Sequence, residues 1–149
     1  MAIRFSLLAG ALLLWLSFPL ANFALCVVEE NTHLREGPGT KFPVSFEVIR
    51  YTPLKKVKKK DGWYEVKDVD GQAHWIREDL VTTNFKCVTI KDEFANLRKG
   101  PGIKYPLAPG KRGDKYLSFR LLSERGEWAK VEDIEGDEAW VLKKLIWVQ

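Results

Sequence analysis

Hydrophobic and polar residues alternate in short runs along most of the chain, which is the pattern of half-buried β-strands. Such runs, rich in β-branched and aromatic residues, cover residues 44–49, 63–66 and 74–76. Asp61-Gly62 and Asp70-Gly71 separate them with residues suited to the positive φ of tight hairpin turns. After residue 26 no stretch sustains apolar residues at helical spacing, and residues 77–80 form at most one turn. The sequence therefore predicts an all-β protein.

The first 24 residues have a different pattern. Arg4 precedes an uncharged apolar run at residues 5–16, and a proline follows shortly after it. This arrangement is typical of a secretory signal peptide, so residues 1–24 are predicted to be a signal helix that is removed on export. Because residues 5–25 are long enough to cross a bilayer, a retained membrane anchor stays an alternative, as does lipidation of Cys26. All three alternatives place the rest of the chain outside the cytosol, in the periplasm or the extracellular space.

The remaining chain contains two copies of one sequence unit. Residues 34–43 align with residues 97–106 at seven identical positions, and residues 63–76 align in the same order with residues 128–141. Two ordered blocks of this kind indicate an internal duplication. A unit of this size usually closes its strands into a small barrel, which hides the sheet edges. The predicted organisation is a signal segment at 1–24, unit one at 25–84 and unit two at 85–149.

These motifs resemble those of bacterial SH3 (SH3b) domains of exported proteins. Residues 96–102 are similar to the family's opening Asn-Leu-Arg-x-Gly-Pro, and residues 62–63 with 71–76 to its closing Gly-Trp and Gly…Trp-Ile. His33 and Glu127 depart from that pattern. The resemblance implies two SH3-like small barrels in tandem, each of five or six strands. The positions that match the family's structural signature are Leu34, Arg35, Gly37, Pro38 and Trp75 in unit one and Leu97, Arg98, Gly100, Pro101 and Trp140 in unit two.

The resemblance also implies a class of function. SH3b domains accompany cell-envelope proteins, and some bind peptidoglycan peptides, so we expect a non-catalytic module that binds a cell-wall polymer. A protein–protein adaptor for an envelope protein, or an accessory or inhibitory subunit of a wall-remodelling complex, stays open because small barrels host many ligands. The chain is expected to be a monomer without cofactor or metal.

Aromatic residues are the candidate ligand-binding positions. Trp75 and Trp140 are assigned to the core because a small unit needs large buried side chains. For Trp63 and Trp128, a place in the core and a place in a groove stay equally open. Tyr64 is alanine in unit two, and an aromatic residue that one copy alone keeps favours recognition. The predicted site is a shallow groove between the signature loop and the Trp63 hairpin. Its candidate residues are Phe42, Trp63, Tyr64, Tyr105 and Trp128.

Charge narrows the class of partner. The 149 residues hold 24 Lys and Arg against 20 Asp and Glu, a net charge of +4, which is too small and too evenly mixed to imply nucleic acid. One run, Lys55–Lys60, has a single non-lysine residue, Val57. We interpret it as a solvated edge strand with Val57 facing inward, in preference to a site for anionic polymers or lipid headgroups. A membrane is expected as a partner only through an uncleaved N-terminal segment.

Two cysteines stand at matching places, just ahead of each signature. In an exported protein an even cysteine count favours a disulfide. Cys26 opens unit one and Cys87 follows its end, and domain termini often lie close together. The sequence therefore favours a Cys26–Cys87 disulfide that fixes the angle between the units, with free thiols as the alternative.

Catalytic chemistry finds little support in the sequence. A Cys–His hydrolase needs a nucleophile held beside its base, and both histidines, His33 and His74, lie at positions that unit two fills with other residues. We interpret His74 as a strand side chain rather than a base. Candidate carboxylates fall at turns, where they are expected to bind their own backbone: Asp68, Asp70, Asp133 and Glu135.

Overall fold

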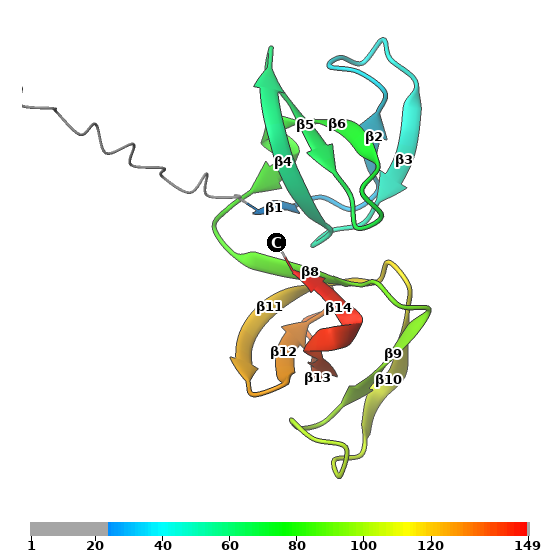
Figure 1. The fold of residues 1–149 in the computed structure, drawn as a ribbon, viewed down its shortest axis with the longest axis vertical. Coiled ribbons are helices and arrows are strands. Elements are labelled where there is room, and N and C mark those ends of the chain that lie inside the picture. Colours follow the sequence, from blue (N-terminus) through cyan, green and yellow to red (C-terminus); the bar gives the residue numbers. More distant parts are fainter. Residues whose placement is uncertain (1–23, 149) are drawn as a thin grey trace, which may run out of the picture.

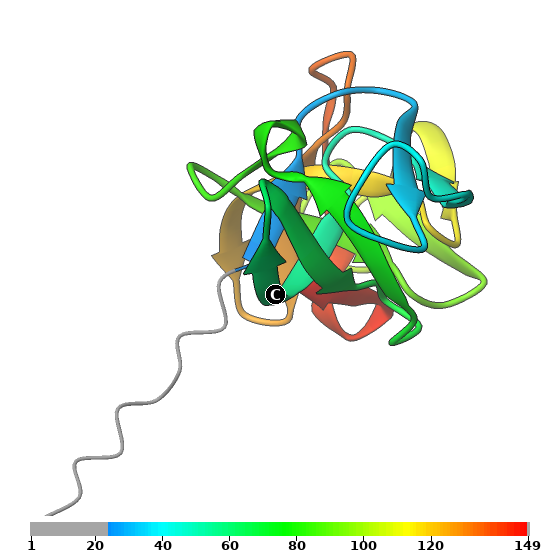
Figure 2. The same ribbon diagram turned by 90° about the horizontal axis from the view of Figure 1, so that it is seen from above.

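The computed structural model describes residues 24–148, which form two curved antiparallel sheets stacked along the long axis of the molecule (Figure 1). Seen along that axis, the two units lie over one another (Figure 2). The all-β prediction is confirmed. Residues 1–23 of the predicted signal helix lie outside the described residues, and its last residue, Ala24, begins a strand. Within residues 24–148 no helix has the length and apolarity that a membrane span requires.

Unit one is built from seven strands. They are β1 (Ala24–Val27), β2 (Thr32–Arg35), β3 (Val44–Val48), β4 (Pro53–Lys60), β5 (Trp63–Lys67), β6 (Ala73–Arg77) and β7 (Val81–Thr82), with one 3-10 turn, η1 (Glu78–Leu80). The order in the sheet is β3-β2-β6-β5-β4-β1-β7, so β3 and β7 are its edges. The β4–β5 hairpin turns at Asp61 and Gly62, whose φ angles are 50° and 81°, as the Asp-Gly pair predicts.

Unit two repeats this arrangement. Its elements are β8 (Lys86–Ile90), β9 (Phe94–Arg98), β10 (Leu107–Asp114), β11 (Ser118–Arg125), β12 (Trp128–Glu132), β13 (Glu138–Leu142), η2 (Lys143–Leu145) and β14 (Ile146–Val148). The order β10-β9-β13-β12-β11-β8-β14 matches unit one strand by strand, which confirms the duplication. Each sheet has more strands than the resemblance implies, because the short strands β7 and β14 pair with the first strand of their own unit.

Each sheet encloses one apolar core, and strand alternation decides which aromatics enter it. The assignment of Trp75 and Trp140 to these cores is wrong. In β6 the buried positions are His74 and Ile76, and Trp75 between them is half-buried. Trp140 alternates in the same way with its buried neighbours in β13. Because successive side chains of a strand point to opposite faces, a strand cannot bury all three.

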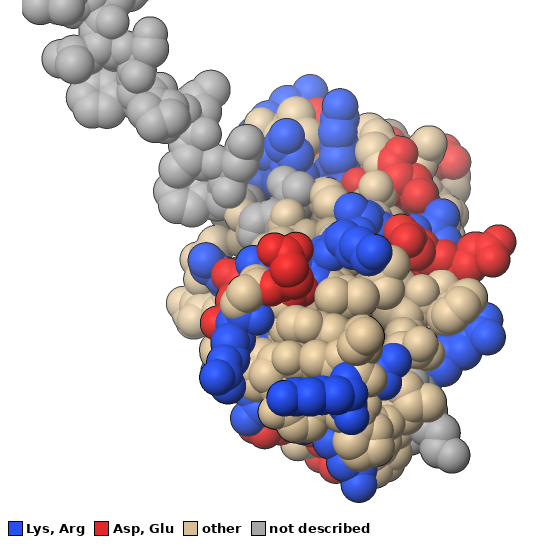
Figure 3. Space-filling model, turned by 60° about the horizontal axis from the view of Figure 1, so that its bottom comes forward, with Lys and Arg blue, Asp and Glu red and all other residues tan. Residues whose placement is uncertain are grey.

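The lysine-rich strand β4 is also placed differently from its prediction. It lies inside the sheet, between β5 and β1, rather than at an edge. A register shift between Lys56 and Lys58 inserts Val57 as an extra residue. Val57 is consequently 49% exposed, and the prediction that it faces inward is wrong. Over the face shown in Figure 3, positive and negative side chains are interspersed rather than gathered into one basic field.

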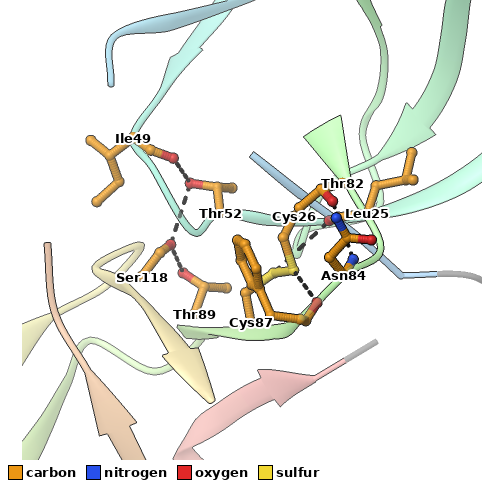
Figure 4. Close-up of a disulfide and its surroundings, with 10 residues drawn as sticks. Leu25, Cys26, Ile49, Thr52, Thr82, Asn84, Cys87, Thr89 and Ser118 are labelled. Carbon is orange, nitrogen blue, oxygen red and sulfur yellow. Dashed lines mark hydrogen bonds between the residues drawn. A yellow bond between two sulfur atoms is a disulfide. The ribbon is translucent and has the colours of Figure 1, made fainter. Parts of the chain in front are cut away.

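A disulfide and a small apolar cluster join the two units. Cys26 on β1 is bonded to Cys87 on β8, with a Cα–Cα distance of 5.9 Å, so the predicted disulfide is confirmed (Figure 4). Both cysteines are fully buried. Tyr51 from unit one and Phe85 from the connecting segment pack beside them with ring centroids 5.6 Å apart, edge to face.

A chain of hydroxyl groups runs beside the disulfide (Figure 4). Thr52 Oγ1 of unit one lies 3.3 Å from Ser118 Oγ of unit two, which donates a hydrogen bond of 3.0 Å to Thr89 Oγ1. The covalent bond, the ring packing and these hydrogen bonds together fix the angle between the units.

Candidate functional site

The signature loop of each unit is tied together by its arginine. In unit one, Arg35 Nη1 donates to the carbonyl oxygens of Thr40 at 3.2 Å and Phe42 at 2.8 Å. In unit two, Arg98 Nη1 donates to the carbonyl oxygen of Tyr105 at 2.9 Å. These bonds occupy part of each five-donor guanidinium. They give each loop a fixed shape, so it forms a preformed wall for whatever binds beside it.

Two predicted ligand-binding aromatics, Phe42 and Tyr105, pack beneath these loops. A Cβ atom added to Gly37 would lie 2.5 Å from the Phe42 ring, and one added to Gly100 would lie 2.3 Å from the Tyr105 ring. The first glycine of each Gly-Pro-Gly is therefore required for close approach of a ring to the backbone. Phe42 and Tyr105 are half-buried. Tyr105 also lines a shallow hollow on one side of Trp128.

Trp63 and Trp128 line equivalent grooves in the two units. Each groove lies between the signature arginine, the turn before the second strand of the unit, and the tryptophan. The unit-one groove has a volume of about 220 Å³, whereas the unit-two groove reaches about 510 Å³. The two grooves lie at equivalent positions of the duplicated fold, and the unit-two groove is the larger.

Replacements between the copies explain the difference. Three polar positions of the unit-one groove are apolar in unit two: Asn31, Thr40 and Arg77 correspond to Phe94, Ile103 and Leu142. Phe94 and Ile103 are 42% and 79% exposed, and the guanidinium carbon of Arg112 lies 3.9 Å from the Phe94 ring centroid. Exposed apolar side chains gathered around a tryptophan give unit two the surface that ligand sites favour.

Tyr64 does not share the groove of Trp63. Adjacent residues of β5 point to opposite faces, and Tyr64 packs against the core of unit one. Its counterpart in unit two, Ala129, is fully buried. Lys56 Nζ lies 4.4 Å from the Tyr64 ring centroid. The structure thus brings Trp63 beside Arg35 in the groove and places Tyr64 elsewhere.

Sequence reasoning missed a cleft of about 720 Å³ between the units. On its unit-one side lies His74, which is only 7% exposed. Its Nδ1 lies 2.7 Å from Ser45 Oγ, and its Nε2 lies 3.1 Å from Asp68 Oδ2. The other Asp68 oxygen accepts backbone N–H groups within its own turn, as predicted for Asp68. The alignment of the two units could have indicated this network, because Ser45 and His74 both correspond to alanines in unit two, Ala108 and Ala139.

Asp70 links the two sides of this cleft, so the prediction that it binds its own backbone is wrong. The hydroxyl of Tyr116 donates to Asp70 Oδ2 at 2.6 Å, and Lys115 Nζ donates to Asp70 Oδ1 at 3.3 Å. The hydrogen bond from Tyr116, and after it the hydrogen bond and the positive charge of Lys115, hold the pKa of Asp70 below its usual value. Within residues 24–148 no cluster of three or more His, Cys, Asp or Glu side chains is placed to hold a metal ion.

Comparison with known proteins gives one family and several partial likenesses. The family model described as bacterial SH3 domain matches residues 28–82 and again residues 91–148. YrvJ of Bacillus subtilis (strain 168), which carries the name of an N-acetylmuramoyl-L-alanine amidase, is 36% identical over 62 residues, or 41% of this chain and 11% of YrvJ. The chain therefore spans about a tenth of that relative.

Among solved structures, an NlpC/P60 family protein from Bacillus cereus ATCC 10987 is similar at 16% identity and a TM-score of 0.38, over 84% of this chain and 56% of that one. NlpC1 from Trichomonas vaginalis is similar at 10% identity and a TM-score of 0.37, over 86% of this chain and 46% of that one.

Proposed function

The chain belongs to the bacterial SH3 domain family, and on that basis we propose that it is a non-catalytic cell-envelope binding module that recognises peptidoglycan peptide or glycan. The observation that carries the proposal is the groove beside Trp128. It recurs at the same place in unit one, but only unit two lines it with exposed apolar side chains. The matched part of the relative named as an amidase is a small fraction of that protein, and the role proposed for this chain is binding alone.

Binding in the unit-two groove rests on three features. Trp128 offers a broad apolar side chain for a sugar ring or a peptide side chain to pack against. The groove is preformed because Arg98 fixes the signature loop, which lowers the entropy lost on binding. Asp92 and Glu93 are in the lining, where their carboxylates would accept hydrogen bonds from the amine or hydroxyl groups of the ligand.

The proposed location is outside the cytosol. The buried Cys26–Cys87 disulfide supports it, because such bonds persist in oxidising compartments and are rare in the cytosol. We propose that residues 1–24 direct export, with cleavage favoured over retention as an anchor.

A second candidate function is that of an envelope protein adaptor. The rigid joint between the units favours it, because two units held at one angle present a single continuous surface to a partner. Crosslinking in intact cells separates the two functions: an adaptor must trap a specific envelope protein, whereas a wall binder need not.

Retention on purified sacculi tests the leading function. We expect the protein to co-sediment with sacculi and Trp128→Ala to weaken retention about tenfold, the usual effect of removing a central aromatic contact. Val57→Ser is the matched control, because Val57 is as exposed as a groove residue but lies on β4 away from the groove. Retention of Trp128→Ala equal to that of the control would exclude the groove as the site.

A further inference from the structure

The free edge of β3 runs along the cleft between the units. Five consecutive residues, 45–49, line that cleft. Because alternate residues of a strand point to opposite faces, a cavity lined by consecutive residues follows the backbone edge of the strand rather than one face. Among the strands of residues 24–148, β3 pairs only with β2, so its outer backbone groups are available to another strand.

The two sheet edges that correspond between the units differ in protection. Both edge strands have an irregular register, β3 at Ser45 between Val44 and Phe46 and β10 between Leu107 and Arg112. β10 also carries Pro109, which discourages pairing with another chain. β3 instead exposes Val44 and Phe46, which is 47% exposed. An apolar edge strand that contains no proline and lies beside a preformed cleft is a place for β-strand addition.

The cleft offers a pocket for a side chain of the added strand. Phe46 of β3 and Tyr116 of unit two face each other edge to face, with ring centroids 6.3 Å apart, and the two residues are 47% and 42% exposed. The disulfide and the Thr52–Ser118 contact hold the two walls at a fixed separation, so the pocket exists before any ligand arrives.

The Ser45–His74–Asp68 network braces the unit-one side of this cleft. It ties β3 to β6 and to the turn that carries Asp70. Unit two makes the equivalent turn, with Asp133 Oδ1 accepting the N–H groups of Glu135 and Asp137, yet has Ala108 and Ala139 in place of the serine and histidine. The network is therefore an addition of unit one that its fold does not require, and its residues act by positioning the cleft.

Charge selects the class of ligand. The cleft is lined by four carboxylates and two cationic side chains: Glu47, Asp68, Asp70 and Asp114 against Arg112 and Lys115. Both cations are already paired within the protein, Lys115 with Asp70 and Arg112 with Asp114, each at 3.3 Å. The lining of the cleft therefore carries more negative than positive charge, although the whole chain has a net charge of +4. Glu47 Oε2 lies 3.3 Å from His33 Nε2, and 58% of the Glu47 side chain is exposed, so a cationic group could reach it from solvent.

From these observations we propose that the inter-unit cleft binds an extended, positively charged peptide segment, which adds as a strand to the free edge of β3. Phe46 and Tyr116 receive one side chain of this segment, and Glu47 attracts its ammonium group. This site is separate from the Trp128 groove and belongs to neither unit alone.

Titration of the ¹⁵N-labelled protein with acetyl-Val-Lys-Val-Lys-Val-amide, followed by NMR, tests the proposal. We expect saturable shifts of the backbone amides of residues 44–48 and 116. Phe46→Ala should weaken binding about tenfold, and the matched peptide with Glu in place of Lys should bind at least about fivefold more weakly. Trp128→Ala should leave the affinity unchanged, which separates this site from the proposed wall-binding groove.

The double variant Ser45→Ala/His74→Ala keeps the test independent of folding, because it installs the residues that unit two already uses. It should fold and bind the lysine peptide about threefold more weakly, as expected for loss of one positioning hydrogen-bond network. Three results would each overturn the proposal: no saturable shift up to about 5 mM peptide, shifts centred on the Trp128 groove, or equal binding of the Glu and Lys peptides. Shifts of residues 44–48 that depend on protein concentration without peptide would also overturn it, since they would show pairing between two copies.

Discussion

Unit one and unit two have the same strand order and the same arginine-tied signature loop, yet they expose different surfaces. Unit two surrounds Trp128 with apolar side chains in a groove of about 510 Å³, whereas the unit-one groove of about 220 Å³ is lined mainly by polar groups. Unit one instead carries the Ser45–His74–Asp68 network and, in β3, an edge strand without proline.

Because the two units share one fold, each unit serves as a control for which residues the fold of the other requires. Positions that both units keep, such as Arg35 and Arg98, are explained by contacts that close the loop. Positions that differ, such as Ile103 against Thr40 or His74 against Ala139, are not required for the fold, since the other unit forms it without them. Recognition is therefore best sought where the copies disagree.

Removing the disulfide that joins the two units should have the largest effect on how they behave relative to one another. The disulfide closes a loop with a sequence separation of 61, so Cys26→Ser/Cys87→Ser should lower stability by about 4 kcal/mol on the chain-entropy model. We expect calorimetry to show two transitions, one for each unit, in place of one. Reduction of the native protein should reproduce this result, and a single transition at an unchanged midpoint would show that the joint does not depend on the disulfide.

A glycine substitution tests whether the shared loops are held in the same way. In Gly37→Ala the new Cβ would meet the Phe42 ring at 2.5 Å, and overpacking of this kind costs about 1–3 kcal/mol. Gly39→Ala is the matched control, because its Cβ would lie at an ordinary 3.6 Å from the same ring. Urea denaturation measures both variants, and equal stabilities would contradict the proposed close packing.

The corresponding pair of glycine substitutions in unit two tests whether the two loops are packed alike. Gly100→Ala would place a Cβ 2.3 Å from the Tyr105 ring, against 3.4 Å for Gly102→Ala. We expect Gly100→Ala to cost about as much as Gly37→Ala, again about 1–3 kcal/mol. A large cost in one unit and none in the other would show that the loops are not equivalent.

The smallest expected effect concerns the link between Asp70 and Tyr116. Because the folded-state pKa of Asp70 is lowered below 3.8, its contribution to stability is present above that pH and is lost as the pH falls through the folded-state pKa. Asp70 is exposed to solvent, so Asp70→Asn should cost less than about 1 kcal/mol at neutral pH, and this cost should vanish in acid. An NMR titration of the Asp70 carboxyl in Tyr116→Phe should show a pKa closer to the usual value, since Tyr116 is the largest cause of the shift.

The strands, the hairpin turns and the disulfide could be predicted because each depends on local alternation, on Asp-Gly pairs or on the matching of two copies. The exposure of Val57 could not, because it depends on a register shift against β5 that alternation within β4 does not reveal. The placement of Trp75 was open to prediction, since His74 and Ile76 on either side of it belong to the opposite face. The cleft beside Phe46 depends on the angle between the units, which arises from contacts between residues distant in sequence.

The most direct test of functional asymmetry between the units is to measure the binding of Trp63→Ala and Trp128→Ala side by side on purified sacculi. The two tryptophans occupy equivalent positions, so the fold treats them alike and only the surrounding groove differs. We expect about a tenfold loss of retention for Trp128→Ala and less than about a threefold loss for Trp63→Ala. Equal losses, or a larger loss for Trp63→Ala, would contradict it.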